Sequence, residues 1–152
     1  MLRPAWYLSD TEWFSLLDDA PQLDDDRQAI IDDLSRVLPN GATSPALTVA
    51  ATFLLVTSAD YLGDTMSWAA KSIDLAELPR LLCGLNLAQA HLTQMIQRMA
   101  AHTAARAFRG SAEVPADVLR AITDSLSVAG ANSELVAAHL KEANLRLHGV
   151  TQ

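Results

Sequence analysis

Residues 75–99 read LAELPRLLCGLNLAQAHLTQMIQRM, and the spacing of the large side chains in this stretch decides the fold class. Apolar residues recur at alternating steps of three and four, with one polar member. The stripe consists of Leu75, Leu78, Leu82, Leu85, Gln89, Leu92, Ile96 and Met99. That spacing marks one face of an α-helix, whereas a half-buried strand would alternate at every second residue. We therefore expect a long helix here that packs along its length.

Two further segments of the chain repeat this spacing. One stripe consists of Leu47, Ala51, Leu54, Ser58, Tyr61, Thr65, Trp68 and Ser72, and the other of Leu119, Ile122, Leu126, Ala129, Ser133, Val136, Leu140, Ala143 and Leu147. No stretch alternates with period two for long enough to form a sheet. A 30-residue helix is about 45 Å long, whereas a compact globule of this size has a radius of gyration of about 15 Å. The sequence thus predicts an all-α protein, an elongated and mostly antiparallel bundle of three long helices in one domain, residues 1–152.

The first 39 residues are acidic and predict two shorter helices. They hold nine carboxylates and three arginines, a net charge of -6 out of -7 for the whole chain. Ser9 and Glu12 have the spacing of a capping box for a first helix, which Pro21 ends. A second helix is expected over residues 23–38, where three aspartates favour its positively polarised start.

Residues 44–148 carry the three long helices. Proline and glycine punctuation places them at about 44–72, 74–108 and 115–147. Pro79 either starts the middle helix or kinks it one turn in. Gly130 lies inside the last helix and marks a kink, a break or a point of close contact between helices.

Small residues follow one side of the last helix. With Leu119 at heptad position a, the e positions are Thr123, Gly130, Ala137 and Asn144. The e and g positions lack the charge pairs that usually select coiled-coil partners. We expect this helix to pack closely within a bundle rather than to form an isolated two-stranded zipper.

The segment 46–59 is apolar on more than one side. It lacks charge, and Val49, Phe53 and Val56 form a second stripe beside the first. Fourteen residues are too few to span a bilayer, so we expect a core helix and no membrane partner. A helix that is apolar all round is covered on all sides, either by the N-terminal helices or by another copy of the protein.

The chain lacks the motifs of several enzyme and metal-site classes. No glutamate stands three residues before any of the four histidines, as a di-iron bundle requires, and no glycine-rich phosphate loop occurs. The aspartate pairs lack the third aspartate of a diphosphate-binding motif. The single cysteine, Cys83, lies among leucines, which is typical of a structural residue. We expect no catalytic residues, no metal and no cofactor. An interrupted apolar start argues against a secretory signal and predicts a cytoplasmic protein.

Two sets of residues are candidates for binding. A basic stripe on the predicted fourth helix consists of His91, Arg98, His102, Arg106 and Arg109. It could meet an anionic ligand, an acidic partner or the acidic helices of the same chain. With Tyr61 and Gln89, the residues His91, Arg98 and His102 form the candidate ligand set. We expect no nucleic-acid partner, because the chain is acidic and no helix-turn-helix signal is present.

The candidate interface consists of Val49, Phe53, Val56 and Trp13. Trp13 also fits the inner face of the first helix, docked on the bundle. These observations favour a non-catalytic protein that self-associates as a homo-oligomer or binds a protein partner. The alternative is a small-molecule-binding bundle, a sensor or an enzyme with a pocket between helices. The sequence leaves both hypotheses open.

Overall fold

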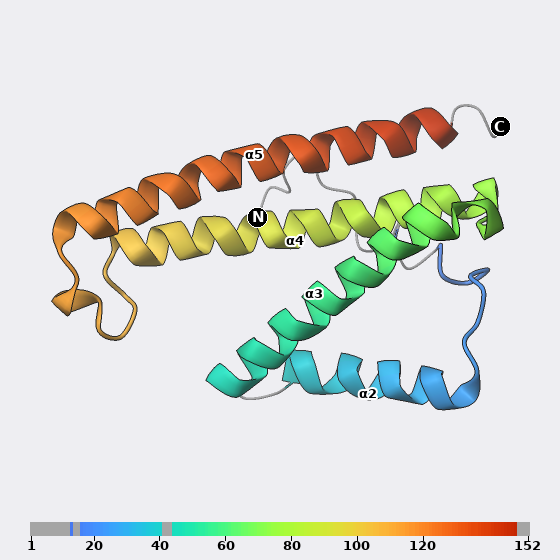
Figure 1. Ribbon diagram of the computed structural model, residues 1–152, viewed down its shortest axis with the longest axis horizontal. Helices are drawn as coiled ribbons and strands as arrows, with labels where there is room; N and C mark the ends of the chain where they lie inside the picture. Colours follow the sequence, from blue (N-terminus) through green and yellow to red (C-terminus); the bar gives the residue numbers. More distant parts are fainter. Residues whose placement is uncertain (1–12, 14–15, 41–43, 149–152) are drawn as a thin grey trace. The chain divides into compact units, whose positions relative to one another are not determined.

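The protein is all-helical in the part that its computed structural model describes, residues 13, 16–40 and 44–148. Four α-helices make up most of it, α2 (Asp25–Asn40), α3 (Pro45–Trp68), α4 (Leu78–Ala104) and α5 (Ala116–His148) (Figure 1). Short 3-10 turns η1 (Ala70–Ser72), η2 (Leu75–Glu77) and η3 (Ser111–Glu113) lie in the connections. The described residues contain no strand, so the predicted all-α class is confirmed.

The chain divides into two compact units, and each is described by itself. One unit is residues 19–75, with α2 and α3; the other joins residues 1–18 to residues 76–152, with α4 and α5. The proposed Ser9–Glu12 capping box lies outside the described residues.

Side-chain caps begin both helices of the unit 19–75. The carboxylate of Asp24 accepts a hydrogen bond from the backbone N–H of Arg27 at 2.9 Å, just before α2. The hydroxyl oxygen of Ser44 accepts one from the N–H of Leu47 at 3.1 Å, and Pro45 occupies the first turn of α3. Both caps satisfy N–H groups that have no partner inside the helix. The predicted Ser44 cap is thereby confirmed.

Helix α3 buries none of its residues. Helix α2, which was expected to cover α3, does not do so, since residues 25–38 also include no buried residue. Its hydroxyl groups bond back to carbonyls four residues earlier, as Thr52 does to Thr48 and Thr57 to Phe53, both at 2.9 Å. Such bonds satisfy the hydroxyls within the helix itself. Within a single chain α3 is therefore not buried, and its expected cover by another copy of the protein stays a prediction.

The length of α3 also corrects an argument from the sequence. The helix continues past Asp60 and Asp64 to Trp68, so its 24 residues extend about 36 Å. By length and composition it could cross a membrane, with a mean hydropathy of 1.4 in its most apolar window. A core helix of a soluble protein passes the same test when it is buried, but none of this window is.

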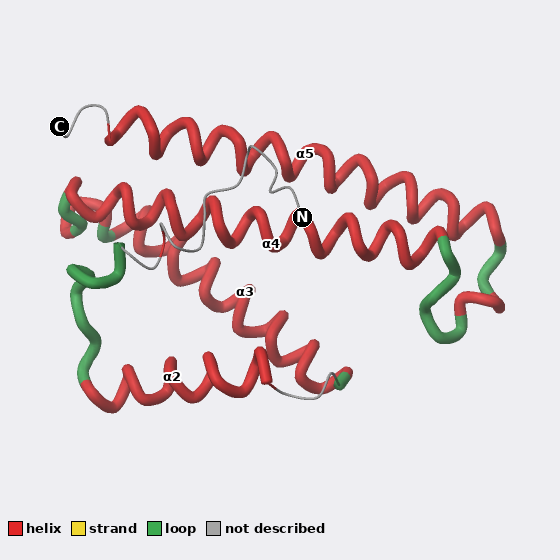
Figure 2. The backbone as a smooth tube through the Cα atoms, turned by 180° about the vertical axis from the view of Figure 1, so that it is seen from behind, coloured by secondary structure: helices red, strands yellow, loops and turns green. Residues whose placement is uncertain are grey.

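Helices α4 and α5 form a hairpin, packed side by side and joined by residues 105–115 (Figure 2). Pro79 stands in the first turn of α4, so of the two alternatives it starts the helix. Helix α5 begins directly after Pro115, as predicted, and runs without a break through Gly130. A methyl group added to Gly130 would lie 3.1 Å from Cγ of Gln97 on α4. Gly130 therefore marks close contact between helices.

Helix α4 ends at Ala104, four residues before the predicted end. Arg106 adopts a left-handed conformation with φ of 53°, which breaks the helical hydrogen-bond ladder. The N–H of Ala107 then bonds to the carbonyl of His102 at 2.9 Å, and that of Arg106 to the carbonyl of Thr103 at 3.1 Å. This is the Schellman pattern, in which glycine usually takes the left-handed position. The predicted basic stripe thus remains helical only as far as His102.

The buried line between α4 and α5, called the seam below, is made of small and polar residues. It consists of Cys83, Asn86, Ala90, Thr93, Ala100 and Thr103 on α4 and Leu119, Gly130, Ala137 and Asn144 on α5. The predicted leucine stripe of α4 stands beside the seam and is half-buried or exposed. Three of the four predicted e positions of α5 are buried, so α5 packs closely on α4, and its packing within a larger bundle stays a prediction.

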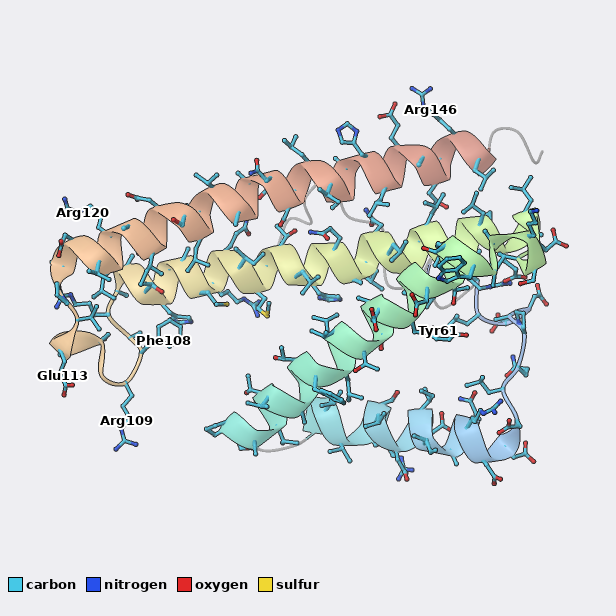
Figure 3. The ribbon with its side chains drawn as sticks, in the orientation of Figure 1. Tyr61, Phe108, Arg109, Glu113, Arg120 and Arg146 are labelled. Atoms are coloured by element: carbon cyan, nitrogen blue, oxygen red, sulfur yellow. The ribbon has the colours of Figure 1, made fainter. Side chains whose placement is uncertain are left out.

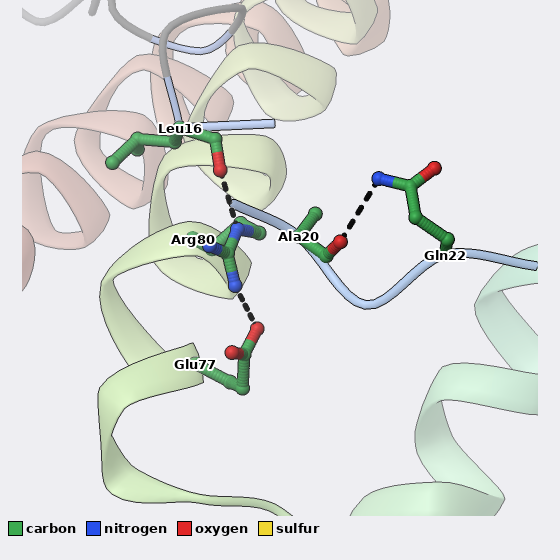
Figure 4. A network of polar contacts seen from close by, with 5 residues as sticks. All are labelled: Leu16, Ala20, Gln22, Glu77 and Arg80. Atoms are coloured by element: carbon green, nitrogen blue, oxygen red, sulfur yellow. Dashed lines mark hydrogen bonds and ion pairs between the residues drawn. The ribbon is translucent and has the colours of Figure 1, made fainter. Parts of the chain in front are cut away.

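One segment near the N-terminus also packs on α4. A methyl group added to Gly84 would lie 2.9 Å from Cζ3 of Trp13, so the indole ring rests against the helix backbone. The guanidinium of Arg80 donates to the carbonyl oxygen of Leu16 at 2.5 Å and pairs with the carboxylate of Glu77 (Figure 4). The prediction that Trp13 docks on the helices is confirmed, so it is a packing residue of its own chain.

Candidate functional site

The described residues hold no group of three or more histidine, cysteine or acidic side chains that could bind a metal ion. Cys83 is buried in the seam, at 1% exposure. Its thiol is shielded from solvent, as expected of a packing residue rather than a nucleophile. Asn144, also in the seam, has an amide oxygen with no hydrogen-bond partner.

The candidate ligand set is divided between the two units and between two faces of α4. Tyr61 is exposed on α3, in the unit 19–75, whereas the other members belong to α4. On α4, successive residues turn by about 100°, which puts Gln89 about 200° away from His91. His91, Arg98 and His102 share an exposed face, and Gln89 is half-buried on another. The structure therefore keeps the basic residues together on one face of α4 and places Gln89 on another face of that helix.

Two hollows instead lie at the closed end of the hairpin. One has a volume of about 260 Å³ and is lined by Thr103, Ala104, Arg106, Ala116, Leu119, Arg120 and Thr123. The other, of about 290 Å³, is lined by Thr103, Phe108, Arg109, Gly110, Ser111, Val114, Leu119 and Ile122. They share two lining residues, so they lie on either side of the same contact between the helices.

The loop that borders both hollows is held by its own hydrogen bonds. The hydroxyl of buried Ser111 donates to the carbonyl oxygen of Arg106 at 2.7 Å. The N–H of Ser111 bonds to the carbonyl of Phe108 at 3.1 Å. The ring of Phe108 meets that of His102 edge to face, with centroids 6.0 Å apart. These contacts fix the backbone from which Arg106 extends.

The closed end of the hairpin is positively charged within an acidic chain. Residues 98–120 contain four arginines, at positions 98, 106, 109 and 120, against the carboxylates of Glu113 and Asp117. In Figure 3, Arg109 extends from the loop away from both helices, and Arg120 lies near the start of α5. Arg120 and Thr103 were not among the candidates, because helical periodicity does not show which turns of two different helices meet. The expected proximity of the two ends of a short-looped hairpin could have indicated them.

Three of the candidate interface residues are exposed on α3, and the fourth packs against α4. Val49 and Phe53 are 68% exposed and Val56 is 62% exposed, all on α3. Trp13 instead packs on Gly84. Further large apolar side chains are exposed on α5, including Val128, Leu135 and Leu145. Contiguous apolar surface on several sides of a helix is a feature of protein or membrane contacts.

Among the residues that the structure describes, Glu142 has a lowered pKa. The guanidinium of Arg146 donates to the carboxylate of Glu142 at 2.6 Å, one turn away on α5. This hydrogen bond and the attraction between the charges lower the pKa of Glu142. The pair is exposed, so it is a local feature of the helix surface rather than a reactive site.

No protein-family model, no curated protein and no solved structure matches this chain. A function is therefore argued from the residues described above.

Proposed function

We propose that the protein is a non-catalytic, self-associating helical protein, and that α3 pairs with α3 of a second copy. The observation that carries the proposal is that a 24-residue apolar helix buries none of its residues, and that Val49, Phe53 and Val56 are more than 60% exposed. Burying one large aliphatic or aromatic side chain contributes about 1.5–3 kcal/mol. An interface that covers Val49, Phe53 and Val56 from both copies would therefore gain several such contributions.

The charge pattern of α3 favours a second copy over a bilayer. The charge-free stretch 46–59 extends about 21 Å, whereas the hydrocarbon core of a bilayer is about 30 Å thick. Spanning would therefore draw Asp60 or Asp64 toward hydrocarbon, which costs about 2.5–3.5 kcal/mol for a carboxylate at the centre. An antiparallel pair centred on Phe53 would instead leave all four aspartates at its two ends, in water.

The proposal includes the elongated, mostly antiparallel bundle that the sequence predicts. Helices of 24, 27 and 33 residues measure about 36, 40 and 50 Å, and they cover most apolar surface when they lie side by side. A second α3 covers only one side of α3. Other long helices of the assembly would cover the remaining sides, as in a homo-oligomer. The proposal keeps the expected cytoplasmic location, and the net charge of -7 argues against a nucleic-acid partner.

The test is the mass of the full chain in solution, measured by native mass spectrometry and by light scattering. The wild type is expected as a dimer or a larger multiple, and Phe53→Glu as a folded monomer by circular dichroism. The matched control is Val128→Glu, which places the same charge at an exposed apolar position of α5. This control is expected to keep the wild-type mass.

Three outcomes would contradict the proposal. A monomeric wild type would refute self-association, and dissociation by Val128→Glu but not by Phe53→Glu would move the interface to α5. Co-sedimentation of the wild type with phosphatidylcholine vesicles, lost in Phe53→Glu, would assign α3 to a bilayer instead.

A further inference from the structure

We propose that the first hollow at the closed end of the hairpin binds the phosphate group of a small molecule through Arg106 and Arg120. The two arginines come from different elements, the loop after α4 and the second turn of α5, and both line this hollow. Its volume of about 260 Å³ leaves room for more than a bare phosphate. The site is separate from α3, so it stands or falls independently of the proposed self-association.

Neither arginine pairs with a carboxylate in the described chain, although two aspartates lie close to Arg120 in the sequence. Asp117 and Asp124 stand three and four positions from Arg120, the spacings at which helix side chains pair. Arg27, Arg36, Arg80 and Arg146 all pair with an acid at such a spacing. In the described chain, neither Arg106 nor Arg120 forms an ion pair. Their guanidinium groups are therefore available to an external anion.

The conformation of Arg106 adds a second observation. It occupies the left-handed position of a Schellman motif, where glycine is the usual residue. Its backbone is held there by the hydrogen bonds to Thr103 and from Ser111. Glycine would adopt this backbone conformation with less strain than arginine does. The turn therefore does not require an arginine at position 106, and a role for its side chain would explain the residue.

The start of α5 adds to the positive character of the hollow. The first ladder bond of α5 is made by the N–H of Leu119 to the carbonyl of Pro115, which leaves the N–H groups of residues 116–118 without a partner inside the helix. Ala116 lines the hollow, whereas Asp117 does not. A helix start favours anions, and a guanidinium donates two parallel hydrogen bonds to a phosphate. Two guanidinium groups and a helix start together suit a phosphate monoester, whose charge of about -2 and three terminal oxygens exceed those of a carboxylate.

The experiment is a titration of the full chain, labelled with 15N, with inorganic phosphate and then glycerol 3-phosphate. Sodium chloride keeps the ionic strength constant, and amide shifts are followed by NMR. We expect saturable shifts confined to residues 103–123, with tighter binding of glycerol 3-phosphate. Arg120→Gln and Arg106→Gly are each expected to weaken binding at least about tenfold, because each removes a charged donor.

Two controls make the result decisive. Arg106→Gly relieves the left-handed strain and is expected to keep or raise the melting temperature, so that lost binding cannot be attributed to unfolding. Arg98→Gln removes an exposed arginine of α4 that lines neither hollow, and it is expected to bind phosphate as the wild type does. Shifts that do not saturate, that fall outside residues 103–123, or that weaken equally in Arg98→Gln would overturn the site.

Discussion

The seam between α4 and α5 and the surface of α3 differ in a way that hydropathy alone does not explain. Helix α3 is the more apolar helix by composition, yet none of its residues is buried. Helix α4 buries six residues, of which Asn86 and Thr93 are fully covered and polar. The small side chains of Gly130 and Ala137 on α5 lie opposite, which lets the two backbones approach.

This difference shows that side-chain size selects the buried line of a two-helix contact. A pair of helices has a single line of closest approach, and small residues on it let the two backbones come close, as Ala90, Ala137 and Gly130 do here. The leucines of α4 therefore stand on its flanks, where a third helix would be needed to cover them. In α3 the large side chains are spread around the helix, so no single partner in a hairpin could cover them.

The largest expected effect comes from enlarging a seam residue. Ala137 has no exposed surface, and its carbonyl accepts a hydrogen bond from the amide of Asn86 at 2.6 Å. Ala137→Leu should lower the free energy of unfolding by about 1–3 kcal/mol, because a close-packed contact cannot take three more carbon atoms. Urea unfolding measures this loss of stability. The control is Val136→Leu at the half-exposed neighbouring position, whose free energy of unfolding is expected within about 0.5 kcal/mol of the wild-type value.

If Ala137→Leu cost no more than Val136→Leu, the seam would not be a close-packed contact.

A somewhat smaller effect is expected from the buried amide of the seam. Asn86→Ala removes the donor to the carbonyl of Ala137 and should cost about 1–2 kcal/mol. The control is Gln97→Ala, which removes an exposed side-chain bond to Glu134 and should cost less than about 0.5 kcal/mol. Equal urea midpoints for the two variants would contradict the expectation that the buried hydrogen bond contributes more to stability than the exposed one.

The dependence of stability on protein concentration tests whether a second copy covers α3. If two copies cover α3, the stability of the assembly should rise with protein concentration by at most about 1.4 kcal/mol per tenfold increase. Val56→Ala, which trims a 62% exposed residue of α3, should reduce this dependence. The measurement is the urea midpoint at two concentrations a hundredfold apart. A midpoint that does not change with concentration in the wild type would contradict the pairing of α3.

The smallest expected effect is at the surface pair of α5. The lowered pKa of Glu142 means that the folded chain favours its ionised form. The pair therefore stabilises the helix above the ordinary pKa of glutamate, and this contribution is lost as the pH falls through the folded pKa. NMR titration of the Glu142 carboxyl carbon should give a midpoint below 4.5, and Arg146→Gln should raise it toward 4.5. An unchanged midpoint in Arg146→Gln would refute this cause.

Local signals in the sequence predicted the elements well and their partners less well. The Ser44 cap, the start of α5 after Pro115 and the small e positions of α5 all depend on residues a few positions apart, and all were confirmed. The end of α4 was placed four residues too late. A left-handed arginine carries no signal in a sequence, since glycine is the residue expected at that position.

The candidate site was only partly predictable for a related reason. Arg106 was in the basic stripe, but Arg120 entered only when the loop brought the start of α5 against the end of α4. The ligand set that included Tyr61 and Gln89 combined residues by chemistry alone, without knowledge of which faces they share. The three-and-four spacing places Gln89 on the same face of the helix as the leucines. It places the basic residues on another face, and the structure agrees.

Capping, periodicity and charge are properties of neighbouring residues, so the helical class, the helix starts and the acidic and basic segments can be predicted from the chain alone. The burial of Asn86 and Ala137, the exposure of Phe53 and the meeting of Arg106 and Arg120 at one hollow follow from the three-dimensional packing. Burial depends on how closely a second helix can approach. That distance is set by the side chains of both partners together, at positions 51 residues apart in the case of Asn86 and Ala137.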